Sequence, residues 1–148
     1  MRILFVCTGN ACRSQMAEGF ARALLHDVLT PFSAGVAPSG LDPRAVAVMA
    51  EAGVDISGQR SKAVSELPDV PFDVVVTLCG QSGDACPYVP GAGRRIHAGF
   101  DDPPALAAGA ASEEEALDHY RRVRDAIRNF VLDLPARLAA SEQPEDPA

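Results

Sequence analysis

Apolar residues along the chain gather in short continuous runs, separated by polar and glycine-rich segments. Runs of this length, rich in branched and aromatic residues, are typical of strands buried in a parallel sheet. The predicted strands cover residues 3–6, 30–33, 73–78 and 94–98.

Between these runs, apolar positions recur every three or four residues, as on one face of a helix. Ser14 opens the first such segment. Asp42-Pro43 is an N-cap followed by proline at the first helical position, and Gly53 is the expected stop. Ser112 and Glu115 form a capping-box pattern that begins a long helix. Its predicted buried face consists of Leu117, Tyr120, Val123, Ile127, Val131 and Leu134.

Alternating strands and helices predict an α/β fold, with a four-stranded parallel sheet flanked by helices in a single three-layer domain. The domain should cover residues 1–140, and the polar tail 141–148 should be flexible. In such sheets the functional site lies at the carboxyl ends of the strands. The loops that follow residue 6 and residue 78 both begin at that edge.

Composition narrows the possible partners. A net charge of −7 and a pI near 4.8 argue against nucleic acid. No apolar run approaches the roughly 20 residues that cross a bilayer, so no membrane association is expected. The first predicted strand begins almost at Met1, which leaves no room for a signal peptide and predicts a cytoplasmic location. A monomer is the default expectation.

The most informative segment runs from Cys7 to Ser14, directly after the first strand. Five residues between Cys7 and Arg13 can curl so that their backbone N–H groups point inward, and Gly9 permits a close backbone approach. Arg13 adds a planar fork for two oxygens of an anion, and the following helix adds the positive end of its dipole. The same field should stabilise the thiolate form of Cys7. The expected oxyanion-binding residues are Thr8, Gly9, Asn10, Ala11, Cys12, Arg13 and Ser14.

The sequence Cys-Thr-Gly-Asn-Ala-Cys-Arg-Ser-Gln-Met-Ala-Glu-Gly, from Cys7 onward, resembles the signature of low-molecular-weight protein tyrosine phosphatases. More narrowly, it resembles the thioredoxin-coupled arsenate reductases that share that fold. The resemblance covers nearly the whole chain, from Arg2 to about Leu138. It implies that Asn10 holds the loop in its strained shape and that Ser14 supports the thiolate.

The resemblance also implies a general acid in the segment Phe-Asp-Asp-Pro that begins at Phe100. Either Asp101 or Asp102 could protonate the departing oxygen. We predict Asp101, the first aspartate of the pattern, as the acid. Asp102 precedes a proline and is interpreted as a turn residue.

Two further cysteines, Cys79 and Cys86, resemble the redox segment of the reductases in position and interval. This resemblance implies a relay: Cys79 attacks Cys7 after arsenate is bound, and Cys86 then attacks Cys79. A Cys79–Cys86 disulfide would be reduced by thioredoxin, although glutaredoxin or another small thiol system remains possible. No tightly bound cofactor is expected.

The alternative is a phosphatase for tyrosyl or small phosphate esters that uses Cys7 and Asp101. No aromatic residue follows Asp101 closely, and Gln15 stands where phosphatases usually have proline; both features favour the reductase. A side activity on small phosphate esters stays possible. A non-catalytic sensor module is disfavoured because nucleophile, arginine and acid are all present.

The remaining candidates have simpler interpretations. The cysteines are not in close pairs and no histidine pair is nearby, so a zinc site is not expected. Cys12 is interpreted as structural, with its side chain turned away from the anion. The three histidines, His26, His97 and His119, are interpreted as surface or packing residues.

Some of the reductases bind potassium beside the loop. By resemblance, the matching positions would be Asn10, Glu18 and Ser33, but the position of the aspartate is taken by Lys62. An ammonium group there repels a cation. We therefore predict that there is no potassium site and that Lys62 pairs near Glu18 and Asn10.

Overall fold

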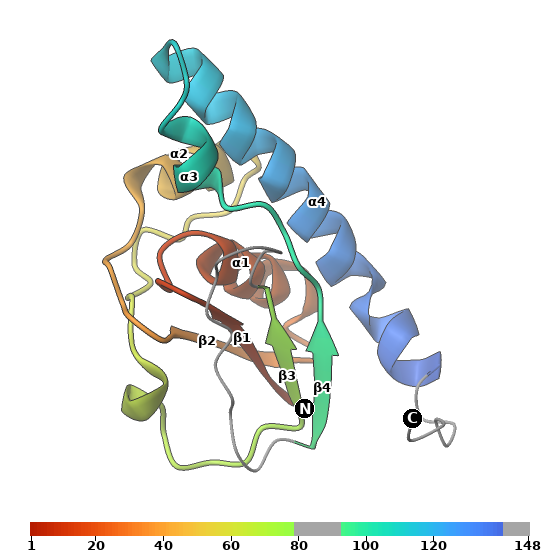
Figure 1. Cartoon of the computed structure of the whole chain (residues 1–148). Coiled ribbons are helices and arrows are strands. Elements are labelled where there is room, and N and C mark those ends of the chain that lie inside the picture. Colours follow the sequence, from red (N-terminus) through yellow and green to blue (C-terminus); the bar gives the residue numbers. More distant parts are fainter. Residues whose placement is uncertain (79–92, 141–148) are drawn as a thin grey trace.

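The protein is described here from a computed structural model, which covers residues 1–78 and 93–140. Its centre is a sheet in the order β2-β1-β3-β4, with every neighbouring pair parallel (Figure 1). The strands are β1 (Arg2–Cys7), β2 (Thr30–Gly35), β3 (Val74–Thr77) and β4 (Arg94–His97). The two interior strands are β1 and β3, whose side chains are mostly apolar and buried.

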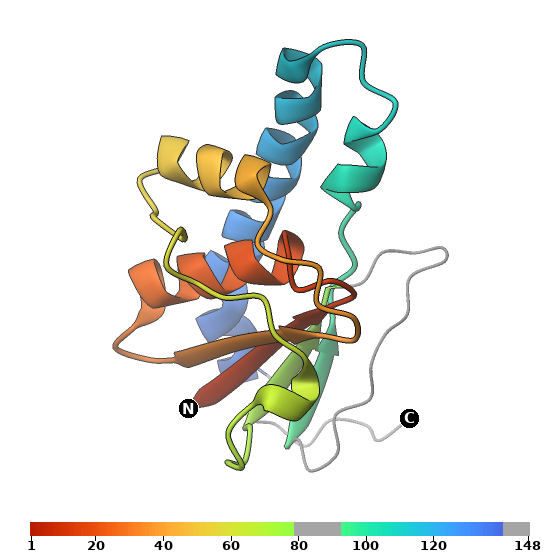
Figure 2. The ribbon, with the colours of Figure 1, turned by 90° about the vertical axis from the view of Figure 1, so that its left-hand side faces the viewer.

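Helices lie mainly over one face of the sheet, where α1 runs beside the strands and α4 crosses behind them (Figure 2). The helices are α1 (Arg13–Leu25), α2 (Pro43–Glu51), α3 (Pro103–Ala107), α4 (Glu113–Ala140) and the short 3-10 helix η1 (Val64–Glu66). Helix η1 lies on the opposite side of the sheet from α1. Within the described ranges, no helix is both long enough and apolar enough to span a membrane.

Side chains of β1 alternate between two apolar clusters, because successive residues of a strand face opposite sides of the sheet. Ile3 and Phe5 belong to the larger cluster, which includes the buried faces of α1, α2 and α4. Leu4 and Val6 face the second cluster, which is closed by the segment 64–72. In the described residues this second face is thus covered by η1 and extended chain rather than by a long helix.

The predicted α/β fold with a four-stranded parallel sheet is confirmed. Helix α2 begins after Asp42 and stops before Gly53, whose φ of 82° is the left-handed conformation expected at a helix end. The prediction missed α3 and η1, which are too short to show a helical period. The predicted flexible tail 141–148 lies outside the described residues.

Gly35, the last residue of β2, explains why a loop can lie directly beside this strand. A Cβ atom on Gly35 would be 2.7 Å from the carbonyl oxygen of Thr8 and 2.8 Å from the backbone nitrogen of Asn10. Both distances are shorter than van der Waals contact with rigid backbone. Glycine therefore lets the loop after β1 approach β2 closely.

Gly19 plays a comparable part in the middle of α1, where an added Cβ would be 2.5 Å from Cγ2 of Ile56. We predict that Gly19→Ala lowers the free energy of unfolding by about 1–2 kcal/mol, because overpacking outweighs the better helix propensity of alanine. Urea denaturation measures the change.

The matched control is Gly58→Ala, since nothing lies within 4 Å of an added Cβ there. It should leave stability unchanged or raise it by up to about 1 kcal/mol. If Gly19→Ala were as stable as this control, close packing of α1 against Ile56 would not limit stability.

Candidate active site

The loop between β1 and α1 is held by hydrogen bonds to its outward-facing carbonyl oxygens. Backbone N–H groups of Ala37, Ser39 and Asp42 donate to the carbonyl oxygens of Thr8, Gly9 and Ala11, at 2.9, 3.0 and 3.0 Å. The hydroxyl of Ser61 also donates to Gly9 O, at 3.1 Å. Because these carbonyls are bound from outside, the loop can turn its N–H groups inward to form an anion-binding cradle.

Asn10 is fully buried beneath this cradle, with a left-handed φ of 46°. Its Nδ2 donates to Ser14 Oγ at 2.8 Å. Its Oδ1 accepts from Gln15 Nε2 at 3.0 Å and from the backbone N–H of Lys62 at 2.9 Å. These bonds compensate for a backbone conformation that is unfavourable for a residue with a side chain.

Cys7 ends β1 at the base of the cradle, and its Sγ lies 2.8 Å from Ser14 Oγ. Since Ser14 Oγ already accepts a hydrogen bond from Asn10, its own proton is available to the sulfur. Helix α1 begins at Arg13 without a side-chain cap, which leaves N–H groups of its first turn available to an anion. This arrangement brings the sulfur of Cys7 and the N–H groups of the loop to the same place, where an oxyanion can bind.

Arg13 is 3% exposed and reaches across the carboxyl ends of β3 and β4. One terminal nitrogen donates to Leu78 O at 3.3 Å and to Phe100 O at 3.1 Å. The other lies 3.7 Å from Asp102 Oδ1. The guanidinium group is therefore oriented by two segments of the chain, Leu78 directly after β3 and the loop that contains Phe100 and Asp102.

Above the cradle lies a cavity of about 310 Å³. Its described lining consists of Cys7, Thr8, Gly9, Ala11, Cys12, Arg13, Ala37, Ser39, Asp102 and Pro104. Of the predicted oxyanion-binding residues, Asn10 and Ser14 are absent from this lining and lie below it. No aromatic side chain lines the cavity among residues 1–78 and 93–140.

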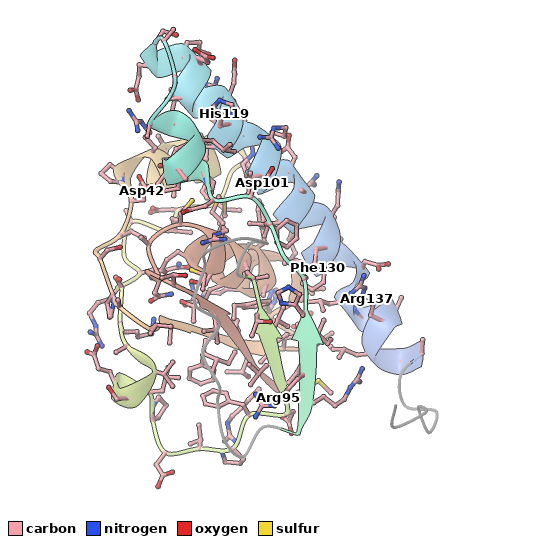
Figure 3. All side chains as sticks on the ribbon, in the orientation of Figure 1. Asp42, Arg95, Asp101, His119, Phe130 and Arg137 are labelled. Atoms are coloured by element: carbon pink, nitrogen blue, oxygen red, sulfur yellow. The ribbon has the colours of Figure 1, made fainter. Side chains whose placement is uncertain are left out.

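The structure places Asp102 in the lining of the cavity, whereas Asp101, the predicted acid, lies outside it. Asp101 points to α4, where its carboxylate pairs with Arg122 at 3.3 Å and is 63% exposed (Figure 3). Asp102 lines the cavity instead and lies beside Arg13. Pro103 starts α3, so Asp102 takes the extended N-cap position, and two adjacent residues in extended chain point in opposite directions.

Cys12 is the second cysteine of the cradle, and it is buried and free. Burial raises the pKa of its thiol well above the ordinary value, and negative charge on Asp42, Cys7 and Asp102 acts in the same direction. A thiol held in its protonated form is a poor nucleophile. This agrees with its interpretation as a structural residue.

The two predicted relay cysteines, Cys79 and Cys86, lie outside the described residues. The described chain resumes at Gly93, and His97 of β4 then meets β3, with Nδ1 2.8 Å from Thr77 Oγ1. Of the other two histidines, His26 lies 3.2 Å from Asp27, its neighbour in the sequence, and His119 is half-buried on α4.

Gln15 and Asp42, which bind the cradle, and Tyr120, which contacts Asp42, are absent from the predicted site residues. Gln15 Nε2 donates to Asn10 O at 2.9 Å and to Arg60 O at 3.0 Å, which joins the cradle to the segment after α2. Asp42 was predicted only as a helix cap, and Tyr120 only as part of a buried face. Of these three residues, only Gln15 was marked by a local feature of the sequence, because it stands where phosphatases usually have proline.

The chain resembles known proteins over most of its length. Residues 2–143 match the model of the family described as low molecular weight phosphotyrosine protein phosphatase. The chain is 48% identical over 127 residues to an arsenate reductase of Bacillus subtilis, which covers 86% of this chain and 89% of the relative.

It is 49% identical over 127 residues to an arsenate reductase of Bacillus licheniformis, which covers 84% of this chain and 88% of the relative. A solved structure described as an arsenate reductase in the phosphate binding state superposes with a TM-score of 0.72 at 34% identity, and covers 92% of this chain and 97% of the other. The chain therefore belongs to the low molecular weight phosphotyrosine protein phosphatase family.

Proposed function

We propose that this chain is an arsenate reductase in which Cys7 attacks the bound oxyanion. The observation that carries the proposal is the cavity itself. Its floor is a thiol supported by Ser14, its wall holds Arg13, and none of its described lining residues is aromatic. A small tetrahedral anion fits such a cavity, whereas the ring of an aryl phosphate ester would find no aromatic side chain among the described lining residues. The arsenate reductases to which the chain is 48–49% identical support the same conclusion.

In the first step, the Cys7 thiolate forms a bond to arsenic and an oxygen of arsenate departs. Arg13 and the N–H groups of the cradle bind the remaining oxygens and offset the charge that develops on them. The departing oxygen needs a proton to leave as water. Asp102, which lines the cavity, is placed to supply that proton.

In the second step, Cys79 attacks the sulfur of Cys7. The sulfur–arsenic bond breaks and its electron pair stays on arsenic, so arsenate is reduced to arsenite while two thiols become a Cys7–Cys79 disulfide. Cys86 then attacks Cys79 and releases Cys7 as a thiolate. This part of the proposal rests on the sequence pattern, because Cys79 and Cys86 lie outside the described residues.

The Cys79–Cys86 disulfide must be reduced before the next turnover. We assign this to thioredoxin or a similar thiol reductant, as the resemblance implied. A cytoplasmic location and a monomeric state stay predictions. The second candidate function, hydrolysis of small phosphate esters, is favoured by the family and by the cradle, which cannot fully distinguish phosphate from arsenate.

A lysine takes the position that would help to bind potassium. Lys62 Nζ lies 3.8 Å from Glu18 Oε1, and Glu18 also accepts hydrogen bonds from Ser33 and Arg22. The carboxylate is thus surrounded by donors. Burial lowers the pKa of Lys62, while the charge of Glu18 acts in the opposite direction. These residues do not fit a cation, and we propose that catalysis does not use one.

The assignment of the acid predicts different effects for two neighbouring aspartates. Asp102→Asn should lower kcat for arsenate about 100-fold or more, because the departing oxygen loses its proton donor. Asp101→Asn, the matched control, should stay within about twofold, because an exposed ion pair contributes little. Steady-state kinetics measure kcat for both variants. A larger loss of kcat in Asp101→Asn than in Asp102→Asn would identify Asp101 as the acid.

The relay predicts that three cysteines are essential and one is not. With arsenate, thioredoxin, thioredoxin reductase and NADPH, the variants Cys7→Ser, Cys79→Ser and Cys86→Ser should each abolish NADPH consumption. Cys12 belongs to the cradle and not to the relay, so Cys12→Ser should weaken arsenate binding but still consume NADPH at saturating arsenate. Asp101→Asn, which lies outside both, is the control and should retain turnover.

The same variants distinguish the rival functions. A phosphatase would lose hydrolysis of a small phosphate ester only in Cys7→Ser and would show no arsenate-dependent NADPH consumption. A sensor module would show neither activity in the parent protein.

The position of Lys62 predicts how activity depends on potassium. Arsenate reduction should show no saturable stimulation when potassium replaces sodium at constant ionic strength. The substitution Lys62→Asp introduces an acidic side chain beside Glu18 and should make activity rise with potassium concentration. Saturable stimulation of the parent protein by potassium alone would contradict the proposal.

A further inference from the structure

Tyr120 of α4 is connected to the cradle although it does not line the cavity. Its side chain is 1% exposed, and its hydroxyl donates to Asp42 Oδ2 at 2.5 Å. The backbone N–H of Asp42 in turn donates to the carbonyl oxygen of Ala11. One residue thus receives a hydrogen bond from α4 and gives one to the anion-binding loop.

Asp42 is also fixed from a second direction. Its Oδ1 accepts from the backbone N–H of Arg44 at 2.9 Å and caps the start of α2. Both carboxylate oxygens are therefore occupied, one by α2 and one by α4. Figure 3 shows Asp42 at the end of α2 that lies near the cradle.

The Tyr120 hydroxyl can serve only as a donor in this contact. Burial raises the pKa of Tyr120, and both the hydrogen bond to Asp42 and the charge of that carboxylate act in the same direction. The proton therefore stays on the phenol over the whole range of physiological pH. A hydrogen bond to a charged acceptor in a buried place is stronger than one on the surface.

This bond matters because the three backbone N–H groups that bind the outer carbonyl oxygens of the cradle are not equally supported. Ala37 and Ser39 follow β2 closely, and β2 is fixed by its pairing with β1. Asp42 comes after Gly40, which has a φ of 90° and nothing within 4 Å of an added Cβ. The third contact is thus separated from the sheet by residues 40–41, and the hydrogen bonds of Asp42 help to fix its position.

We propose that Tyr120 is a positioning residue for the oxyanion cradle, acting through Asp42 on the carbonyl of Ala11. This inference rests on the proposed function only in that the cradle binds an oxyanion. The half of the cradle that Ala11 belongs to leads directly into Arg13 and α1. When the hydroxyl is removed, Asp42 keeps its cap but loses its connection to α4, and the N–H groups next to Ala11 converge less well on the anion.

The test uses Tyr120→Phe, which keeps the buried ring and removes only the hydroxyl. The dissociation constant of inorganic phosphate, an unreactive probe of the cradle, should rise about three- to tenfold in calorimetry. The KM for arsenate should rise by a similar factor with a smaller change in kcat, since binding of the ground state and of the transition state is weakened together.

A matched control removes another contact between α4 and α2 that does not involve Asp42. Arg121, the next residue of α4, pairs with Glu51 of α2 through two hydrogen bonds of 2.9 Å. Arg121→Gln should leave the phosphate dissociation constant within about twofold. If Tyr120→Phe lowered thermal stability but bound phosphate as the parent does, its role would be structural only and the proposal would be overturned.

A second variant keeps the test decisive if Tyr120→Phe does not fold. Asp42→Ser retains an N-cap and the backbone N–H, but its side chain is too short to keep both contacts. It should weaken phosphate binding as Tyr120→Phe does. Asp42→Asn offers one acceptor oxygen in place of two, so it can keep the cap or the bond from Tyr120 but not both, and it should weaken phosphate binding as well. Unchanged affinity in Asp42→Ser would refute the inference. A parent protein that binds neither phosphate nor arsenate would instead refute the proposed function.

Discussion

The backbone from Thr8 to Ala11 has its carbonyl oxygens bound from outside, and the chemistry of the site depends on this constraint. Oxygen atoms that faced the cavity would repel an anion. The segment 37–42 binds these oxygens, and it can do so because β1 and β2 run parallel with Cys7 opposite Gly35. The lack of a side chain at Gly35 then brings the loop against the strand. The register between β1 and β2 thus determines the shape of the loop.

An acidic protein can bind an anion here because the local field differs from the net charge of −7. Inside the cradle the positive groups are Arg13 and the open end of α1. Glu18, the buried carboxylate nearby, lies below the loop and is neutralised by Lys62 and Arg22. Fixed dipoles and one oriented guanidinium group are sufficient, since they are held in place before the anion arrives.

The two cysteines of the cradle show how small differences in surroundings divide chemical roles. Cys7 receives a hydrogen bond from a hydroxyl whose lone pair is already used by Asn10. Cys12 is buried near the carboxylates of Asp42 and Asp102, which keeps its thiol protonated. Identical side chains five positions apart in the sequence therefore have different surroundings. The difference depends on neighbours contributed by distant parts of the chain.

The sequence by itself determined the sheet, the helix boundaries at Asp42 and Gly53, and the loop from Cys7 to Arg13, because these follow from local pattern and spacing. It led to Asp101 as the acid, whereas Asp102 lines the cavity, because adjacent residues differ only in which way the folded chain turns them. Nor did it connect Tyr120 to the site: a buried aromatic residue at helical spacing looks like any other core residue. Only tertiary structure, which brings α4 against the start of α2, gives its hydroxyl a partner.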